Sequence, residues 1–303
     1  MWGVLAGAAL WGVSGNAAQE LFRHGAVDPL WLVAVRMLAG GSGLLAGWRL
    51  AGHRALPRLR PGDAWRLVVF ALAGLGPVQY TYLAAIRDGN AVAATLLQYL
   101  APVFLMGWAA WRERRRALWR EIAGWLLAAG STTVLLTDGR AGSLWVPPAA
   151  VAWGLASAVA AAFYTAYPRR LILRYGAIPV VGWGLVVGGL PFAPTLLTVP
   201  PPTGTTSWIL VGLVALVGTS AAFTLYLASL AWLLPVEASL LAAAEPLAAT
   251  AVGVGWLHVP FDAWTGAGAA GIVAAVLVLT APGGPDRAGA EPTPGPTSSP
   301  PVR

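Results

Sequence analysis

The strongest candidate for chemistry in this sequence is Glu245, a carboxylate inside an apolar segment. A carboxylate near the centre of a membrane helix costs about 2.5 to 3.5 kcal/mol on insertion scales, so we expect it to face a bundle interior, a water-filled cavity or a partner. Two interpretations are open: Glu245 binds a substrate amine or a proton, or it only ties helices together. Pro246 cannot donate a backbone hydrogen bond, and we expect it to leave a carbonyl near Ala242 free.

Arg36 is another charged residue inside an apolar segment, seven residues after Pro29. An unpaired guanidinium would be expensive in hydrocarbon. Arg36 is therefore expected to pair with a buried acid, to contact a substrate carboxylate, or to extend its side chain to the membrane interface. We favour the structural pair among these three interpretations.

Uncharged polar side chains and tyrosines complete the candidate site. Gln79 and Tyr82 are three residues apart and share a helix face, and Gln98 lies one turn before Pro102. Interhelical hydrogen bonding explains any single one of them equally well, but together they predict a translocation cavity for a zwitterion or an aromatic substrate. The predicted cavity residues are Glu245, Gln79, Tyr82, Gln98, Asn16, Gln19, Arg36, Tyr164 and Tyr226.

The elements that position these residues are long apolar runs. The sequence is 57% hydrophobic and only 10% charged, with a mean hydropathy of +0.68, whereas soluble domains contain about a quarter charged residues. Runs of about 18 to 23 residues cross a ~30 Å hydrocarbon core as helices. The sequence therefore predicts an all-α integral membrane protein with ten transmembrane helices, at residues 2–19, 29–48, 64–86, 90–111, 119–137, 148–167, 178–197, 208–228, 236–257 and 264–281.

Composition excludes several kinds of chemistry. The sequence has no Cys, which excludes disulfides and thiol catalysis, and its three His residues lie at or near predicted loops without metal-site spacing. It has no Lys, and hence no P-loop for ATP hydrolysis. We therefore expect no catalytic residue, no metal and no cofactor.

The net charge of +7 comes entirely from arginines that lie mostly in short loops. Thirteen of the 19 lie in or just after the loops that follow the second, fourth and sixth predicted helices. This alternation is the pattern that sets membrane orientation, so it argues against a nucleic-acid partner. Because the arginine-rich side is normally cytoplasmic, we expect both termini in the cytoplasm.

An internal repeat divides the chain. A shift of 144 residues places Tyr82-Leu83-Ala84 on Tyr226-Leu227-Ala228 and Pro102 on Pro246. Five helices per copy is an odd number, so the second copy is inverted, with a site expected near the midplane between the halves. The predicted units are residues 1–138 and 139–281, followed by a disordered cytoplasmic tail at 282–303, which is rich in Pro, Gly, Ser and Thr.

These motifs resemble the EamA-type branch of the drug/metabolite transporter superfamily. In the first copy, the resemblance comes from Tyr82-Leu83-Ala84, from Ala101-Pro102-Val103-Phe104 and from residues 111–114, where Arg112 replaces the family's Gly. In the second copy, Leu234-Pro235 and Glu245-Pro246 resemble the signature of the amino-acid and metabolite exporters. Leu257-His258 replaces the expected Gly-Glu there.

The resemblance implies a multi-pass plasma-membrane transporter of small metabolites, often amino acids moved outward, without an ATPase motor. The leading hypothesis is therefore a secondary transporter, not an enzyme, that works by alternating access, with proton coupling through Glu245 as one option. The partners expected are a small-molecule substrate and the lipid bilayer, and the oligomeric state is open. The alternatives are a membrane enzyme acting on lipid-linked substrates, for which clustered carboxylates or His are missing, and a passive channel, for which no filter motif is evident.

Overall fold

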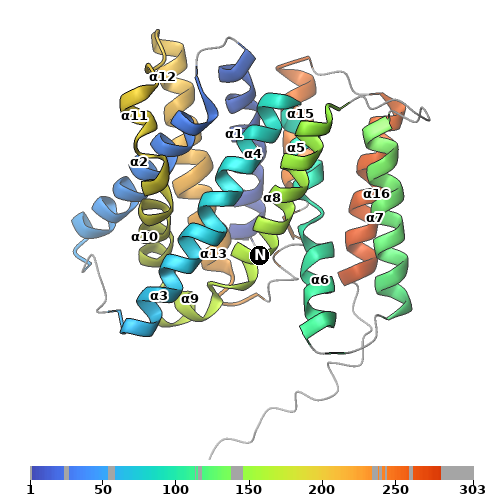
Figure 1. Ribbon diagram of the computed structural model, residues 1–303, viewed down its shortest axis with the longest axis horizontal. Helices are drawn as coiled ribbons and strands as arrows, with labels where there is room; N and C mark the ends of the chain where they lie inside the picture. The colour runs from blue at the N-terminus through green and yellow to red at the C-terminus, as the bar shows by residue number, and fades with distance from the viewer. Residues whose placement is uncertain are drawn as a thin grey trace, which may run out of the picture.

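The computed structural model describes residues 2–23, 27–53, 59–112, 114, 118–137, 146–233, 238, 241–242, 244–258 and 262–280. These residues form helices and short connections, and the described part contains no strand. The predicted tail at 282–303 and Leu234-Pro235 lie outside the described residues. The all-α prediction is confirmed (Figure 1).

In the first half, the described residues form seven α-helices and one π-helical segment. They are α1 (Trp2–Arg23), α2 (Pro29–Leu50), α3 (Pro61–Val69), η1 (Phe70–Leu75), α4 (Gly76–Asp88), α5 (Ala91–Gln98), α6 (Ala101–Arg112) and α7 (Trp119–Thr137). Asp28 caps α2 by accepting a hydrogen bond from the Leu30 backbone nitrogen, and Pro29 suits the first helical position. Asn90 caps α5 in the same way through the Ala93 nitrogen.

The second half has a similar order of elements. They are α8 (Pro148–Ala166), α9 (Arg169–Tyr175), α10 (Ala177–Gly189), η2 (Leu190–Phe192), α11 (Thr195–Thr198), α12 (Thr205–Gly212), η3 (Leu213–Ala221), α13 (Ala222–Ser229), α15 (Ala244–Gly255) and α16 (Ala263–Thr280). Five helical segments among the described residues are long and apolar enough to cross a bilayer: Pro29–Leu50, Pro61–Asp88, Ala91–Trp108, Pro148–Ala166 and Thr205–Ser229. Shorter apolar helices accompany them at Ile122–Val134, Ala177–Phe192 and Ala263–Ala275.

Both halves contain a π-helical segment at the same place. η1 and η3 overlap when the chain is shifted by 144 residues. In η3, the Thr219 hydroxyl donates to the Val214 carbonyl at 2.9 Å and the Ser220 hydroxyl to the Ala215 carbonyl at 3.2 Å, each five residues back. π-Helical turns are rare and frequent at functional sites, so their recurrence supports the proposed duplication.

Each half also contains a helix that is interrupted where a single helix was predicted. The predicted helix at 90–111 is split at Tyr99 and Leu100, between α5 and α6. The predicted helix at 236–257 has a turn at Ala242, and α15 begins at Ala244. The physical reason is the proline that follows each break, because its ring clashes with the carbonyl four residues earlier and it has no backbone N–H.

The helix contacts of one half correspond to those of the other half under the repeat. α1 packs against α15, η3 and α13, while α8 packs against α5, α6, η1 and α4. α2 packs against α10, and α7 packs against α16. The pair α7 and α16 lies at the right of Figure 1. We propose that the halves are the units 1–138 and 139–281 predicted above.

Several described helix ends that carry or flank arginines lie at one end of the bundle. The end of α6, the start of α3 and all of α9 lie toward the bottom of Figure 1. Asp63 attaches α9 to α3 by accepting from Arg174 Nη1 at 2.7 Å and from the Tyr175 hydroxyl at 2.8 Å. The hydrogen bond to Asp63 raises the pKa of Arg174, so this guanidinium stays charged.

Candidate functional site

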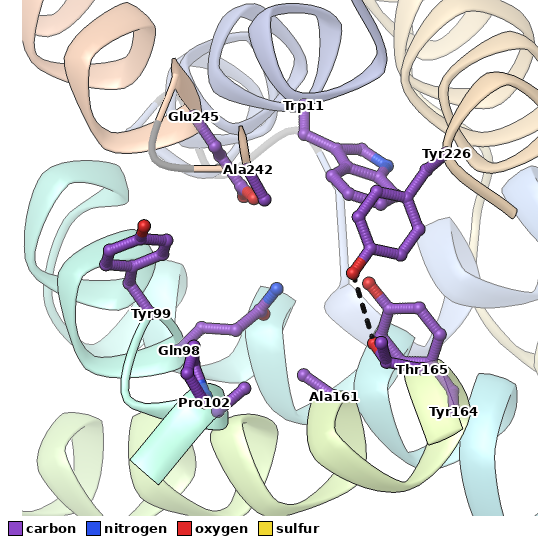
Figure 2. A pocket seen from close by; sticks show the side chains of 11 residues that line it. Trp11, Gln98, Tyr99, Pro102, Ala161, Tyr164, Thr165, Tyr226, Ala242 and Glu245 are labelled. Atoms are coloured by element: carbon purple, nitrogen blue, oxygen red, sulfur yellow. Dashed lines mark hydrogen bonds between the residues drawn. The ribbon is translucent and has the colours of Figure 1, made fainter. Parts of the chain in front are cut away.

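A polar pocket lies between the two helix breaks (Figure 2). The cavity has a volume of about 30 Å³, enough for about two or three water molecules. Small-molecule pockets usually enclose about 300 to 1,000 Å³, so the helices are contracted around this site. Of the residues that the structure describes, eleven line it: Trp11, Gln98, Tyr99, Ala101, Pro102, Ala161, Tyr164, Thr165, Tyr226, Ala242 and Glu245.

Glu245 lies in the first turn of α15 and not in the middle of a helix. Its carboxylate is directed into the pocket in Figure 2, and the residue is 6% exposed. The positive end of the helix dipole favours a negative charge at this position. In the described part of the chain no hydrogen bond or ion pair reaches the carboxylate. This combination suits a residue whose partner is a ligand.

The expectation of a free carbonyl near Ala242 was wrong. The Glu245 backbone nitrogen donates to the Ala242 carbonyl at 2.8 Å. In a continuous helix the Ala242 carbonyl would lack a partner, because Pro246 has no backbone N–H. The turn at the break instead pairs this carbonyl with the backbone nitrogen three residues later.

Gln98 faces Glu245 across the pocket from the end of α5. Its Oε1 accepts a hydrogen bond of 2.6 Å from the Ser157 hydroxyl on α8. The amide nitrogen is directed toward the pocket centre in Figure 2. Gln98 therefore offers a hydrogen-bond donor on the side opposite the carboxylate.

An aromatic wall closes another side of the pocket. The ring centroid of Trp11 lies 5.0 Å from that of Tyr226, and Tyr164 lies 6.2 Å from Tyr226. Phe223 packs edge-on against Trp11 at 4.8 Å. The Tyr226 and Thr165 hydroxyls are 3.4 Å apart at the pocket edge. Such a wall combines apolar area with hydroxyl groups.

Three predicted cavity residues instead connect helices outside the pocket lining. Asn16 Nδ2 donates to the Ala249 carbonyl at 2.9 Å, which joins α1 to α15. Gln19 Oε1 accepts from the Ala91 backbone nitrogen at 2.7 Å, at the first turn of α5. The Tyr82 and Thr95 hydroxyls are hydrogen-bonded at 2.8 Å between α4 and α5.

Arg36 and Gln79 are also buried but do not line the pocket. Arg36 Nε donates to the Thr219 hydroxyl in η3 at 2.8 Å. In the described part of the chain Arg36 has no acidic partner, so the favoured acid pair is absent there. Gln79 Nε2 has no hydrogen-bond partner among the described residues.

Several pocket residues carried too weak a sequence signal to be predicted. Trp11 belongs to a Trp-Gly pair that recurs at Trp153-Gly154, and this recurrence could have indicated its position. Its indole nitrogen is buried and has no partner among the described residues. Tyr99 was missed because the break that turns it into the pocket was not predicted.

The repeat relates the polar residues of the pocket to alanines. A shift of 144 residues places Gln98 on Ala242 and Ala101 on Glu245. All four line the same pocket. Each break thus contributes one polar and one small side chain, in opposite order.

Comparison with known proteins places this architecture in a family. The EamA-like transporter family matches residues 1–137 and 148–281. The chain is 34% identical over 283 residues to the uncharacterized inner membrane transporter YicL of Salmonella typhimurium, covering 92% of this chain and 94% of that protein. It is 31% identical over 169 residues to the aromatic amino acid exporter YddG of Ancylobacter novellus, covering 55% and 57%. A crystal structure 21% identical in sequence covers 92% of this chain and 97% of its own, with a TM-score of 0.66, which shows the shared fold.

Proposed function

This chain belongs to the EamA-like transporter family, and we propose that it exports amino acids or related zwitterionic metabolites by alternating access around the central pocket. The observation that carries the proposal is Glu245, a buried carboxylate with no partner in the described chain, facing the Gln98 amide in a pocket built by both halves.

The lining suits a small zwitterion. A substrate ammonium group would approach Glu245, because a charged hydrogen bond compensates both buried groups. The substrate carboxylate would accept hydrogen bonds from the Gln98 amide and the tyrosine hydroxyls. An apolar or aromatic side chain would pack against Trp11 and Tyr226. The name of the relative YddG, an aromatic amino acid exporter, agrees with this chemistry.

The helix breaks and π-helical segments supply the movement that export requires. Discontinuous helices around a midplane site are common in transporters built from inverted repeats. The contracted pocket of about 30 Å³ cannot hold an amino acid until the helices separate. We propose that the two halves rock against each other and open the pocket to one side at a time.

Glu245 is also the proposed proton site. If a proton and the substrate amine compete for this carboxylate, outward movement of substrate is coupled to inward movement of a proton. Following the arginine distribution, we propose that the protein lies in the plasma membrane with both termini in the cytoplasm.

The experiment is counterflow in proteoliposomes. Vesicles loaded with unlabelled phenylalanine should accumulate external radiolabelled phenylalanine transiently above equilibrium, and a panel of other amino acids and an organic acid defines the substrate. A passive channel equilibrates label without such an overshoot. Absence of overshoot for every amino acid tested would refute amino-acid exchange. The family and both named relatives are transporters, which favours this function over an enzyme.

A further inference from the structure

A second cavity opens between α6, α7 and α8, and none of its lining residues lines the central pocket. It has a volume of about 890 Å³. We call it the lateral groove and define it by its aromatic side chains, which are Phe104, Trp108, Trp111, Trp125, Phe163 and Tyr167. Its volume lies in the range of sites that hold small organic ligands.

The lateral groove faces the outside of the bundle. Trp108 is 57% exposed and Val159, also in its lining, is 51% exposed. Trp108 packs on Trp111 with ring centroids 5.2 Å apart, and Phe163 stacks on Tyr167 at 4.8 Å. In a membrane protein, an apolar groove of this orientation is open to acyl chains.

A basic pocket of about 640 Å³ adjoins one end of the groove. We call it the arginine pocket, because Arg169, Arg170 and Arg174 contribute to its lining. Ala166 and Tyr167 line both cavities, so they are continuous. The combined site is apolar along α6 and α8 and cationic where α9 begins.

Two of the three positive charges have no compensating acid in the described part of the chain. Arg174 is bound to Asp63 at 2.7 Å. Arg169 and Arg170 form no ion pair with any described residue. The Arg169 Nε is buried and makes no hydrogen bond with described residues. The arginine pocket therefore has charge available for an anion.

We propose that this composite site binds an anionic glycerophospholipid of the surrounding leaflet, with its phosphate at Arg169 and Arg170 and one acyl chain in the lateral groove. A soluble phosphate would use only the basic end, and basic pockets between transmembrane helices are suited to anionic headgroups. The zwitterionic phosphatidylcholine carries a quaternary ammonium that Arg169 and Arg170 repel. An anionic lipid fits both the arginine pocket, through its phosphate, and the lateral groove, through its acyl chain.

The test is native mass spectrometry of the delipidated full chain in detergent, with phosphatidylglycerol and phosphatidylcholine of identical acyl chains. We expect preferential retention of phosphatidylglycerol. The double variant Arg169→Gln/Arg170→Gln should weaken that binding by roughly 30-fold, about fivefold for each arginine. The matched control Arg49→Gln/Arg60→Gln removes the same charge from exposed residues outside both cavities and should bind like the original protein.

A second variant tests the lateral groove. A Cβ at Gly107 would meet only Trp125 Cζ2, at 3.9 Å, so Gly107→Leu fills the groove and favours the helix. It should retain thermal stability and lose phosphatidylglycerol. A phosphatidylglycerol with a photoreactive acyl chain should cross-link to α6 and α8 of the unaltered protein, and soluble glycerol phosphate should not displace it.

Three results would overturn the proposal: equal retention of both lipids, equal loss in the control and the Arg169/Arg170 variant, or cross-links outside the groove. Displacement by glycerol phosphate would show a site for a soluble phosphate instead. The readout is lipid binding, so it stands or falls separately from amino-acid export.

Discussion

The two helix breaks have the same construction and different chemistry. Each consists of a short turn followed by a helix with Pro in its first residues, Pro102 in α6 and Pro246 in α15. At the first break the polar side chain is Gln98, before the turn, and at the second it is Glu245, after the turn. The duplicated backbone therefore supplies the geometry, and the departures from symmetry supply a carboxylate facing an amide.

The same contrast applies to the helices that support the breaks. Gly12 on α1 approaches the backbone of α15, whereas Gly154 on α8 approaches the Leu97 side chain on α5. A shift of 142 residues relates these two glycines. The second break is thus held by backbone contact, and the first by side-chain packing.

Removing the charge from the second break should have the largest effect. Glu245→Gln keeps the shape and removes the negative charge, so export should fall by about 100-fold, the upper range for a hydrogen bond between charged groups. Residual transport should lose its pH dependence. Proteoliposome counterflow at several pH values measures both quantities.

A transposed variant sharpens this comparison. In Glu245→Ala/Ala101→Glu the carboxylate moves to the equivalent position of the first break, and transport should recover about tenfold relative to Glu245→Ala alone. Export by Glu245→Gln at the original rate, with unchanged pH dependence, would remove the carboxylate from the mechanism.

Replacing each of the two related glycines by alanine should show how strongly each break depends on the contact made there. A Cβ at Gly12 would lie 2.6 Å from the Ala249 backbone nitrogen and 2.8 Å from the Glu245 carbonyl oxygen. Gly12→Ala should lower the free energy of unfolding by about 2 kcal/mol. Gly154→Ala should lower it by about 1.5 kcal/mol, because Leu97 Cδ1 can rotate away but Leu97 Cβ, 2.7 Å from the added Cβ, moves only with its backbone. Thermal unfolding in detergent tests the order. Gly43→Ala in α2, where a Cβ meets nothing within 4 Å, is the control that measures the gain in helix propensity without a clash.

At the first break, removing the amide should have a smaller effect than removing the carboxylate. Gln98→Leu deletes a neutral donor and should raise the substrate KM by about fivefold to tenfold. Gln79→Leu is the matched control, since Gln79 is buried outside the pocket. An equal rise in KM for both variants would show that the amide acts only through packing.

The smallest effect is expected outside the pocket. Tyr82→Phe removes the 2.8 Å hydrogen bond to Thr95 and should cost about 1 kcal/mol of stability. The KM should stay unchanged, in contrast to Tyr226→Phe in the pocket. Melting curves and transport assays of the two variants test this expectation, and a raised KM for Tyr82→Phe would contradict it by showing a role for Tyr82 in substrate binding.

The sequence predicted the helical architecture well because membrane helices are defined by long apolar runs. The predicted helix at 119–137 has the bounds of α7, and Pro29 begins α2 as predicted. The interruptions were missed because a proline inside an apolar run is compatible with either a kink or a break, and the residues beside Pro102 and Pro246 do not distinguish these two outcomes.

The candidate site was predicted only by residue type. Gln98, Tyr164, Tyr226 and Glu245 meet in one pocket, whereas Asn16, Gln19 and Tyr82 hydrogen-bond between helices. A buried polar side chain gives the same sequence signal in both roles. Which role it takes depends on which face of the helix it occupies and on the partners that other helices present, such as the Ala91 nitrogen for Gln19.

The most direct test of alternating access uses a single cysteine at Ala242, because the chain contains no natural Cys. Ala242 lines the pocket opposite the first break and is almost completely buried. In oriented proteoliposomes, Ala242→Cys should react with a membrane-impermeant thiol reagent added on either side, and transported substrate should slow both reactions. Reaction from one side only, or reaction unaffected by substrate, would contradict a pocket that opens alternately to the two faces of the membrane.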